Sequence, residues 1–124
     1  MIDLNYKIKV LNELGIYISK ILNNKSQSTL DNLSVSMLDN NRWFDKKSIA
    51  YSFRAWSEIL KKDFIKKWLC KYQISSFKKK KKIALILPGN IPLVGFHDIL
   101  CIWILGYEGI IKLSSKDNVS IPFL

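Results

Sequence analysis

Residues 82–113 constrain most strongly what this chain can fold into. The apolar runs "KIALIL" (residues 82–87) and "GIIKL" (residues 109–113) are short and continuous, which is typical of strands buried on both faces. We expect an apolar helix between them over residues 93–105, ending at Gly106, because glycine commonly terminates helices. Strand, helix and strand in this order predict a βαβ unit with two adjacent parallel strands. A further helix is expected to begin near Val119.

The first part of the chain is expected to be helical. Apolar residues recur every three or four positions over residues 4–22, which is typical of an amphipathic helix. Three shorter helices are expected up to about Tyr72, and their predicted N-caps are Ser28 or Thr29, Asp45 and Asp63. Aromatic residues at helical spacing are more often core than binding platform. The tryptophans of this stretch are therefore predicted core residues: Trp43, Trp56 and Trp68.

The predicted fold class is α/β, with a helical N-terminal segment followed by the first βαβ unit of a Rossmann-type parallel sheet. A sheet of these strands alone would leave its apolar faces open to water. We therefore expect an incomplete sheet, and a chain that forms the front end of a larger protein. The expected division is a helical region over residues 1–77 and the start of an α/β cofactor-binding domain over residues 78–124.

The net charge of +10 is compatible with nucleic-acid binding. Yet only Arg42 and Arg54 among the 20 basic residues are arginines, and arginine is the residue that binds phosphates and base edges bidentately. The excess of lysine accompanies abundant Ile and Asn, whose codons are also rich in A and T, so genome composition is the preferred explanation. The lysine run at residues 78–82 is expected to be a solvated linker, and nucleic acid is not an expected partner.

The sequence predicts a cytoplasmic protein. No apolar run approaches the roughly 18–20 residues that span a bilayer. Asp3 and the lack of a small-residue cleavage site make the N-terminus a poor signal peptide. Cys70 and Cys101 lie in apolar helical contexts and form no CxxC pair, so two buried, reduced thiols are expected.

The segment "PGNIP" (residues 88–92) is a rigid loop between the first strand and the following helix. The spacing of Gly89 and Gly95 does not fit a GxGxxG dinucleotide fingerprint, and no GK[ST] triplet of a Walker A loop is present. One interpretation makes the Asn90 amide a hydrogen-bond donor to a developing oxyanion at the carboxyl end of the strand. The other makes the loop a shaped turn in which Asn90 caps the helix.

The segment "LILPGNIPLVGFHDILCIWILGYEGIIKLSSKD" resembles the LuxC-type fatty-acyl-CoA reductases of the aldehyde dehydrogenase superfamily. In that superfamily a strand is followed by a P-x-N-x-P loop, a helix ending at a glycine turn and a strand ending in K-P-S-x. The matching parts here are residues 88–92, the turn at Gly106 and residues 112–115. Upstream, "NNRWF", "AWSEIL" and "KKWL" resemble the helical N-terminal part of bacterial acyl-CoA reductases, so the resemblance covers nearly the whole chain.

The resemblance implies an aldehyde-dehydrogenase-like enzyme that reduces a fatty acyl-CoA or related acyl thioester to the aldehyde with NADPH, through a cysteine acyl-enzyme. Asn90 matches the asparagine that stabilises the oxyanion, and Lys112 matches the lysine that contacts the adenosine ribose. Ser115 replaces a glutamate of many NAD-preferring members, and beside Lys116 it suits a 2′-phosphate. The implied cofactor-binding residues are Leu87, Pro88, Gly89, Lys112, Ser114 and Ser115. The intact enzyme is expected to be a homo-oligomer.

The family's catalytic cysteine lies downstream of these residues, so this chain alone is expected to be inactive. Cys70 and Cys101 have no histidine or helix N-terminus evidently placed to favour the thiolate, and are interpreted as structural. His97 is expected on a helix surface rather than as a general base, and no metal site is expected. The alternative function is a stand-alone basic helical module whose lysine run contacts nucleic acid or an anionic membrane.

Overall fold

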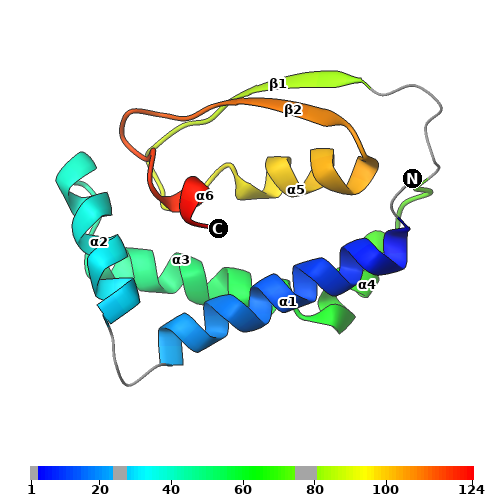
Figure 1. The fold of residues 1–124 in the computed structure, drawn as a ribbon, viewed down its shortest axis with the longest axis horizontal. Helices are drawn as coiled ribbons and strands as arrows, with labels where there is room; N and C mark the ends of the chain where they lie inside the picture. The colour runs from blue at the N-terminus through cyan, green and yellow to red at the C-terminus, as the bar shows by residue number, and fades with distance from the viewer. Residues whose placement is uncertain (1–2, 24–27, 75–80) are drawn as a thin grey trace.

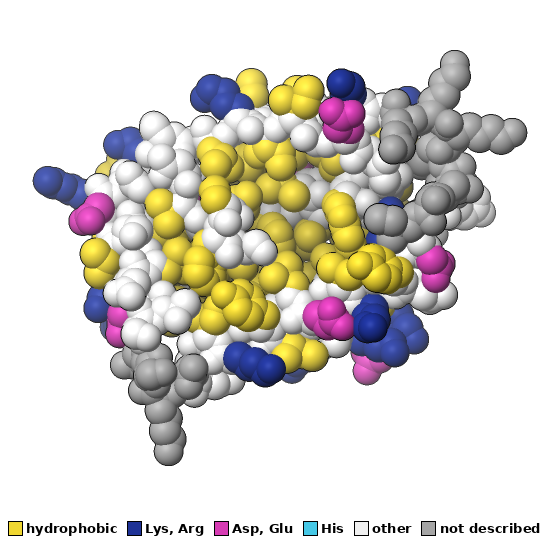
Figure 2. Space-filling model, viewed as in Figure 1, with side chains coloured by type: hydrophobic (Ala, Val, Ile, Leu, Met, Phe, Trp, Pro, Cys, Tyr) yellow, Lys and Arg dark blue, Asp and Glu magenta, His cyan; other side chains and the backbone are white. Residues whose placement is uncertain are grey.

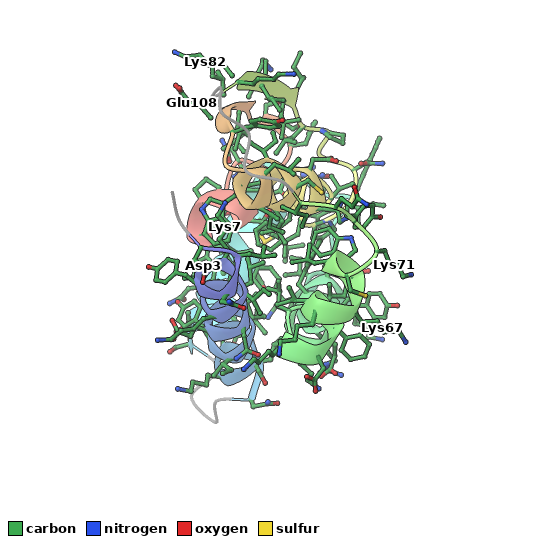
Figure 3. All side chains as sticks on the ribbon, turned by 90° about the vertical axis from the view of Figure 1, so that its right-hand side faces the viewer. Asp3, Lys7, Lys67, Lys71, Lys82 and Glu108 are labelled. Carbon is green, nitrogen blue, oxygen red and sulfur yellow. The ribbon has the colours of Figure 1, made fainter. Side chains whose placement is uncertain are left out.

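The structure, a computed structural model, describes residues 3–23, 28–74 and 81–124. It is mixed α/β and mostly helical, with a small parallel sheet, as the sequence predicted (Figure 1). The elements within the described ranges are α1 (Leu4–Asn23), α2 (Ser28–Asn40), α3 (Lys46–Ile59), α4 (Lys62–Leu69), β1 (Lys82–Ile86), α5 (Phe96–Leu105), β2 (Glu108–Lys112) and α6 (Ser120–Phe123). Figures 1 and 3 show the sheet as an outer layer, α5 beneath it, and α1 with α4 beyond α5.

The N-terminal helices follow the predicted apolar stripes, but their caps differ from the prediction in part. The Asp45 cap is confirmed, because its side chain accepts a hydrogen bond from Ser48 N at 2.6 Å in a capping box. The Asp63 cap is wrong. Helix α4 already begins at Lys62, and the capping oxygen comes from α1, where Asn12 Oδ1 accepts from Lys62 N at 2.9 Å. Helix α2 is described from Ser28 on, so the predicted cap residues lie inside it.

The sheet confirms the predicted βαβ unit in its strand order and direction. Strand β1 pairs with β2 in parallel, in a register that runs from Lys82 opposite Glu108 to Ile86 opposite Lys112. Helix α5 begins three residues later than predicted because Leu93 has a left-handed backbone (φ 61°), which a right-handed helix cannot contain. The predicted stop at Gly106 is confirmed, with φ 75°.

Among the described residues, the outer face of the sheet is open to solvent. Ile86 is 79% exposed and Ile110 is 56% exposed. The prediction that the strands are buried on both faces is wrong for the described residues, because α5 packs against one face and no described element covers the other (Figure 3). Within the described residues, β1 and β2 are therefore covered by a helix on one face only.

The hydrophobic core lies between α5 and the N-terminal helices. Phe96, Leu100 and Ile104 of α5 belong to one cluster with buried residues of α1, α3 and α4. Figure 2 shows hydrophobic side chains gathered in the middle of one face, with Lys and Arg around its rim. Each such buried side chain contributes roughly 1.5–3 kcal/mol by leaving water. This shared core fixes the strand–loop–helix segment against the helical region.

A buried lysine joins α1 to the end of α5. Lys7 is 7% exposed, and its Nζ donates to the carbonyl oxygens of Trp103 at 3.1 Å and Ile104 at 2.8 Å (Figure 3). These carbonyls lie in the last turn of α5, where Trp103 O also accepts from Gly106 N at 3.1 Å and Ile104 O lies beyond the reach of the helix's own N–H donors. Burial lowers the pKa of Lys7. A cation at a helix C-terminus is also favoured by the helix dipole, so Lys7 acts as a cap from a distant element.

Candidate functional site

The end of β1 directs the loop of residues 88–92 to the carboxyl edge of the sheet. Leu87 N donates to Lys112 O at 3.0 Å, which continues the pairing of the strands by one residue. The Leu87 side chain is 7% exposed and anchors the loop in the interior. Because the strands are parallel, the residues after each strand meet at the same edge. The predicted cofactor segments, residues 87–89 and 112–115, are therefore side by side.

Gly89 packs directly on the segment that follows β2. A Cβ atom added to Gly89 would lie 2.5 Å from Ser114 Oγ and 2.8 Å from Lys116 Cβ, so only glycine fits this contact. Ser114 Oγ itself accepts a hydrogen bond from Lys116 N at 3.1 Å. Asp117 N closes the turn by donating to Ser114 O at 3.2 Å. The two loops form one compact surface at the sheet edge.

Asn41, at the end of α2, fastens the helical region to this loop. Its side chain is buried, with the residue only 3% exposed, and its Nδ2 donates to Gly89 O at 2.7 Å. Its Oδ1 accepts from Trp43 N at 2.9 Å. One buried amide therefore holds both the loop and the chain that leads into α3. The contact joins residues 48 positions apart in sequence, and no local pattern in the sequence predicted it.

An open cavity of about 580 Å³ lies between the loop and the α2–α3 connection. Asn90 contributes an exposed side chain to it, without a hydrogen-bond partner for its amide among the described residues. The interpretation of Asn90 as a helix cap is wrong, because the N-cap of α5 is Gly95. The residues that line the cavity are Asp39, Asn40, Asn41, Arg42, Trp43, Gly89, Asn90 and Lys116.

The other predicted cofactor residues surround this cavity without lining it. Lys112 ends β2 with an exposed side chain, and Ser115 is also exposed. Ser114 is half-buried beneath Gly89, and Pro88 is exposed beside it. Lys112, Ser114 and Ser115 are not among the described residues that line the cavity. All the predicted site residues therefore lie at the carboxyl edge of the sheet. Gly89 and Asn90 line the cavity, whereas Lys112, Ser114 and Ser115 lie on the neighbouring surface.

Trp43 is a correction to the predicted core. It is 85% exposed, whereas Trp56 and Trp68 pack against the core as expected. The reason is local, since Trp43 lies in the turn between α2 and α3 and not on a helical stripe. Helical spacing therefore says nothing about its burial. Its position beside Asn90 makes it a site residue that the sequence interpretation missed.

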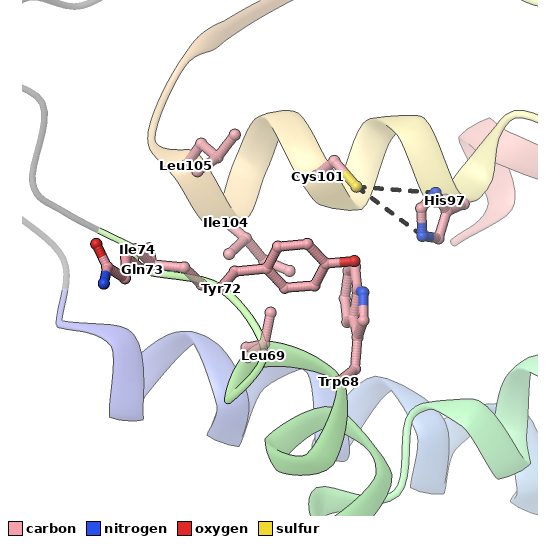
Figure 4. A pocket seen from close by; sticks show the side chains of 9 residues that line it. All are labelled: Trp68, Leu69, Tyr72, Gln73, Ile74, His97, Cys101, Ile104 and Leu105. Atoms are coloured by element: carbon pink, nitrogen blue, oxygen red, sulfur yellow. Dashed lines mark hydrogen bonds between the residues drawn. The ribbon is translucent and has the colours of Figure 1, made fainter.

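A second cavity, of about 390 Å³, lies between α4 and α5 (Figure 4). It is lined mainly by apolar side chains, with Cys101 and His97 on α5. Cys101 Sγ lies 3.8 Å from His97 Nδ1, a pairing that the i, i+4 spacing could have indicated. Burial, and then the neighbouring Asp98 carboxylate, raise the pKa of the Cys101 thiol. The thiol form is therefore favoured at neutral pH despite the adjacent imidazole.

The expectation of two buried thiols is wrong. Cys70 is exposed, and Cys101 is half-buried. Cys70 follows the last residue of α4, where its Sγ donates to Lys67 O at 3.2 Å. A helix end facing solvent leaves this thiol uncovered.

The lysine run behind the alternative function falls mostly outside the described residues, which resume at Lys81. Lys82 is exposed, and its Nζ lies 3.5 Å from Glu108 Oε1 on the neighbouring strand (Figure 3). Within the described ranges, no three His, Cys, Asp or Glu side chains gather as a metal site would require. Among the same residues, none of the helices has the length and apolar character of a membrane span. No family model, curated protein or solved structure matches the chain.

Proposed function

We propose that this chain forms the N-terminal part of an acyl-CoA reductase and that β1–α5–β2 begins its nicotinamide-cofactor domain. The observation that carries the proposal is the packing of the Asn90 loop against residues 114–116 at the carboxyl ends of parallel strands. Ligands of open α/β sheets bind at such edges. The motif resemblance supplies the reaction class: reduction of a fatty acyl-CoA or related thioester to the aldehyde, in the cytoplasm.

The side chains available at the edge suit a phosphorylated cofactor. Lys112 and Ser115 are exposed, and no carboxylate lies within ion-pair distance of Lys112 or Lys116 among the described residues. In the proposed enzyme Lys112 holds the adenosine ribose, while Ser115 with Lys116 accepts a 2′-phosphate. Ser114, Gly89, Pro88 and Leu87 form the surface beneath. NADPH bound here would supply the hydride.

Asn90 has the proposed catalytic role. Its exposed amide donates a hydrogen bond to the thioester carbonyl oxygen, where negative charge develops when the cysteine of the enzyme attacks. Asn41 and the contact with Ser114 hold the backbone of the loop at Gly89, so only the Asn90 side chain needs to reorient during the reaction. Preorganised donors of this kind stabilise the transition state more than the bound substrate.

The open sheet face supports a larger α/β domain. Ile86 and Ile110 are apolar side chains on a surface that soluble proteins normally cover. In the proposed enzyme further strands and helices cover them, and the assembled enzyme is a homo-oligomer.

The test uses an enzyme in which this segment is joined to a domain that carries the catalytic cysteine. Asn90→Ala should lower kcat about a hundredfold to a thousandfold with little change in NADPH affinity. Lys112→Ala should instead raise the KM for NADPH more than it lowers kcat. Asn32→Ala, an exposed asparagine on α2, is the matched control and should leave both unchanged. Full turnover by a folded Asn90→Ala enzyme would mean that the loop is only a turn and that Asn90 has no role in catalysis.

A further inference from the structure

Strand β2 has one edge without a partner strand among the described residues, since only β1 pairs with it (Figure 1). Glu108 N donates to the residue just before β1 at 2.9 Å, and Lys112 O accepts from the residue just after β1 at 3.0 Å. Alternate residues of a strand bond to the same side, so Gly109 and Ile111 direct their N–H and C=O groups to the open edge. Such an edge is a template for another strand.

Solvent reaches β2 along its whole length. All of its residues are exposed, including Ile110 at 56% and Ile111 at 37%, whereas Ile83 and Leu85 of β1 are half-buried. Ile110 lies opposite the exposed Ala84 in the register, so its side chain belongs to the open face of the sheet. The edge of β2 is therefore accessible to a strand from another molecule.

The sequence of β2 is complementary to a second β2 that runs antiparallel to it. The strand reads E-G-I-I-K, so pairing about a two-fold axis at Ile110 places Glu108 opposite Lys112 of the second copy. Gly109 then lies opposite Ile111 of the second copy, and these pairs exchange the hydrogen bonds that the edge leaves open. The charged pairs and the central pair of Ile110 side chains lie at the other positions, where side chains approach more closely.

The surroundings of the charges favour this pairing over one through β1. Glu108 Oε1 lies 3.5 Å from Lys82 Nζ, so in the pair of β2 strands its carboxylate would lie between two lysines. Within the described residues, Lys112 has no carboxylate at ion-pair distance, and the second copy would supply one. Opposite charges directly across antiparallel strands are stabilising. Strand β1 reads K-I-A-L-I and would place Lys82 opposite Ile86.

We infer that two copies of the 124-residue chain dimerise through β2 and join their sheets into one. The inference goes beyond the proposed function and describes these residues by themselves. In the proposed enzyme a third strand would take the same edge, as in the usual strand order of dinucleotide-binding sheets, and would leave Lys112 to the cofactor. The dimer through β2 is therefore distinct from the homo-oligomer of that enzyme.

Charge reversal tests the pairing, with the dimer Kd measured by sedimentation velocity over a range of chain concentrations. Glu108→Lys and Lys112→Glu should each raise the Kd about tenfold, because the two-fold axis turns both opposite-charge pairs into like-charge pairs. Glu58→Lys and Lys61→Glu are the matched controls, since they reverse an exposed ion pair between α3 and α4. Both controls should leave the Kd unchanged, and far-UV circular dichroism verifies that each variant is folded.

Mixing the two β2 variants should restore most of the affinity. In the mixed dimer the new lysine lies opposite the new glutamate, and the unchanged Glu108 of one chain lies opposite the unchanged Lys112 of the other. Labelling one variant with ¹⁵N allows native mass spectrometry to identify the heterodimer. Amide hydrogen exchange at Gly109 and Ile111 should slow as the chain concentration rises, whereas exchange at Ala84, on the outer edge of β1, should not.

Three results would overturn the inference. A chain that stays monomeric, with Gly109 and Ile111 exchanging fast at every concentration, would leave the edge for a strand outside these residues. Assemblies that the charge variants do not weaken would point to the open apolar face of the sheet. Absence of a heterodimer in the mixture would exclude the antiparallel register. The proposed function fails separately, through the effects of Asn90→Ala and Lys112→Ala on turnover and NADPH.

Discussion

Removing the Asn41 side chain should destabilise the protein far more than removing its neighbour Asn40. Asn41→Ala deletes the donor to Gly89 O at 2.7 Å and the acceptor of Trp43 N at 2.9 Å. Asn41 is 3% exposed, so water replaces these partners poorly. A buried polar backbone group left without a partner costs about 1–3 kcal/mol, and the low end, about 1–1.5 kcal/mol, applies because both hydrogen bonds are only partly buried. The two together predict a loss of about 2–3 kcal/mol in the free energy of unfolding.

Asn40→Ala is the matched control because Asn40 also bridges α2 to the C-terminal segment. Its Nδ2 donates to Asn118 Oδ1 at 3.0 Å, but both residues are exposed. Water takes over such a hydrogen bond, so the expected loss is below about 0.5 kcal/mol. Urea unfolding at low protein concentration, followed by far-UV circular dichroism, measures both variants. A loss for Asn41→Ala within about 0.5 kcal/mol of the control would refute the role of Asn41 as the tie between helices and loop.

Gly89→Ala should lower the free energy of unfolding by about 1–3 kcal/mol, because its Cβ would clash with the loop after β2. Gly109→Ala places its Cβ 3.5 Å from Ile102 Cγ2, an ordinary contact, and should change the free energy of unfolding by less than about 0.5 kcal/mol in the same urea assay. Lys7→Met should cost about 2 kcal/mol by removing the donor to the end of α5. Burial lowers the pKa of Lys7, so the unfolded chain binds this proton more strongly, and the stability of the unsubstituted chain relative to Lys7→Met should rise with pH through the alkaline titration of Lys7. Iodoacetamide should alkylate Cys101 more slowly than the exposed Cys70 at neutral pH and faster as pH rises, as measured by peptide mass spectrometry, because burial and a neighbouring carboxylate raise the pKa of Cys101.

Contrary results are equally specific. Similar losses for Gly89→Ala and Gly109→Ala would contradict the close contact between the two loops. A Lys7→Met chain as stable as the unsubstituted one would mean that water caps α5. Equal alkylation rates of Cys70 and Cys101 at neutral pH would contradict the shielding of Cys101.

The sequence predicted those parts of the fold that local patterns encode. The apolar stripe of α1, the cap at Asp45 and the stop at Gly106 each depend on residues within one or two helical turns, and all are confirmed. The order and direction of β1 and β2 follow from the βαβ pattern. The start of α5 was misplaced because no residue type signals the left-handed backbone of Leu93.

The contacts that hold the candidate site together could not be predicted from local patterns. Asn41 meets Gly89 across 48 positions, Lys7 meets Ile104 across 97, and Asn12 meets Lys62 across 50. Each is a polar side chain that satisfies a backbone group of a distant element, and its role exists only after the core has brought the elements together. Trp43 was misassigned for the opposite reason, because a helical rule was applied to a turn.

Amide chemical-shift mapping tests the central claim most directly. The ¹⁵N-labelled 124-residue chain is titrated with NADPH, and the shift of every assigned backbone amide is followed. A cofactor site at the carboxyl edge of the sheet predicts saturable shifts that are largest at Gly89, Asn90, Ser114 and Ser115, and that are lost on Lys112→Ala. An absence of shifts at the highest attainable NADPH concentration, or shifts confined to α1–α4, would contradict it.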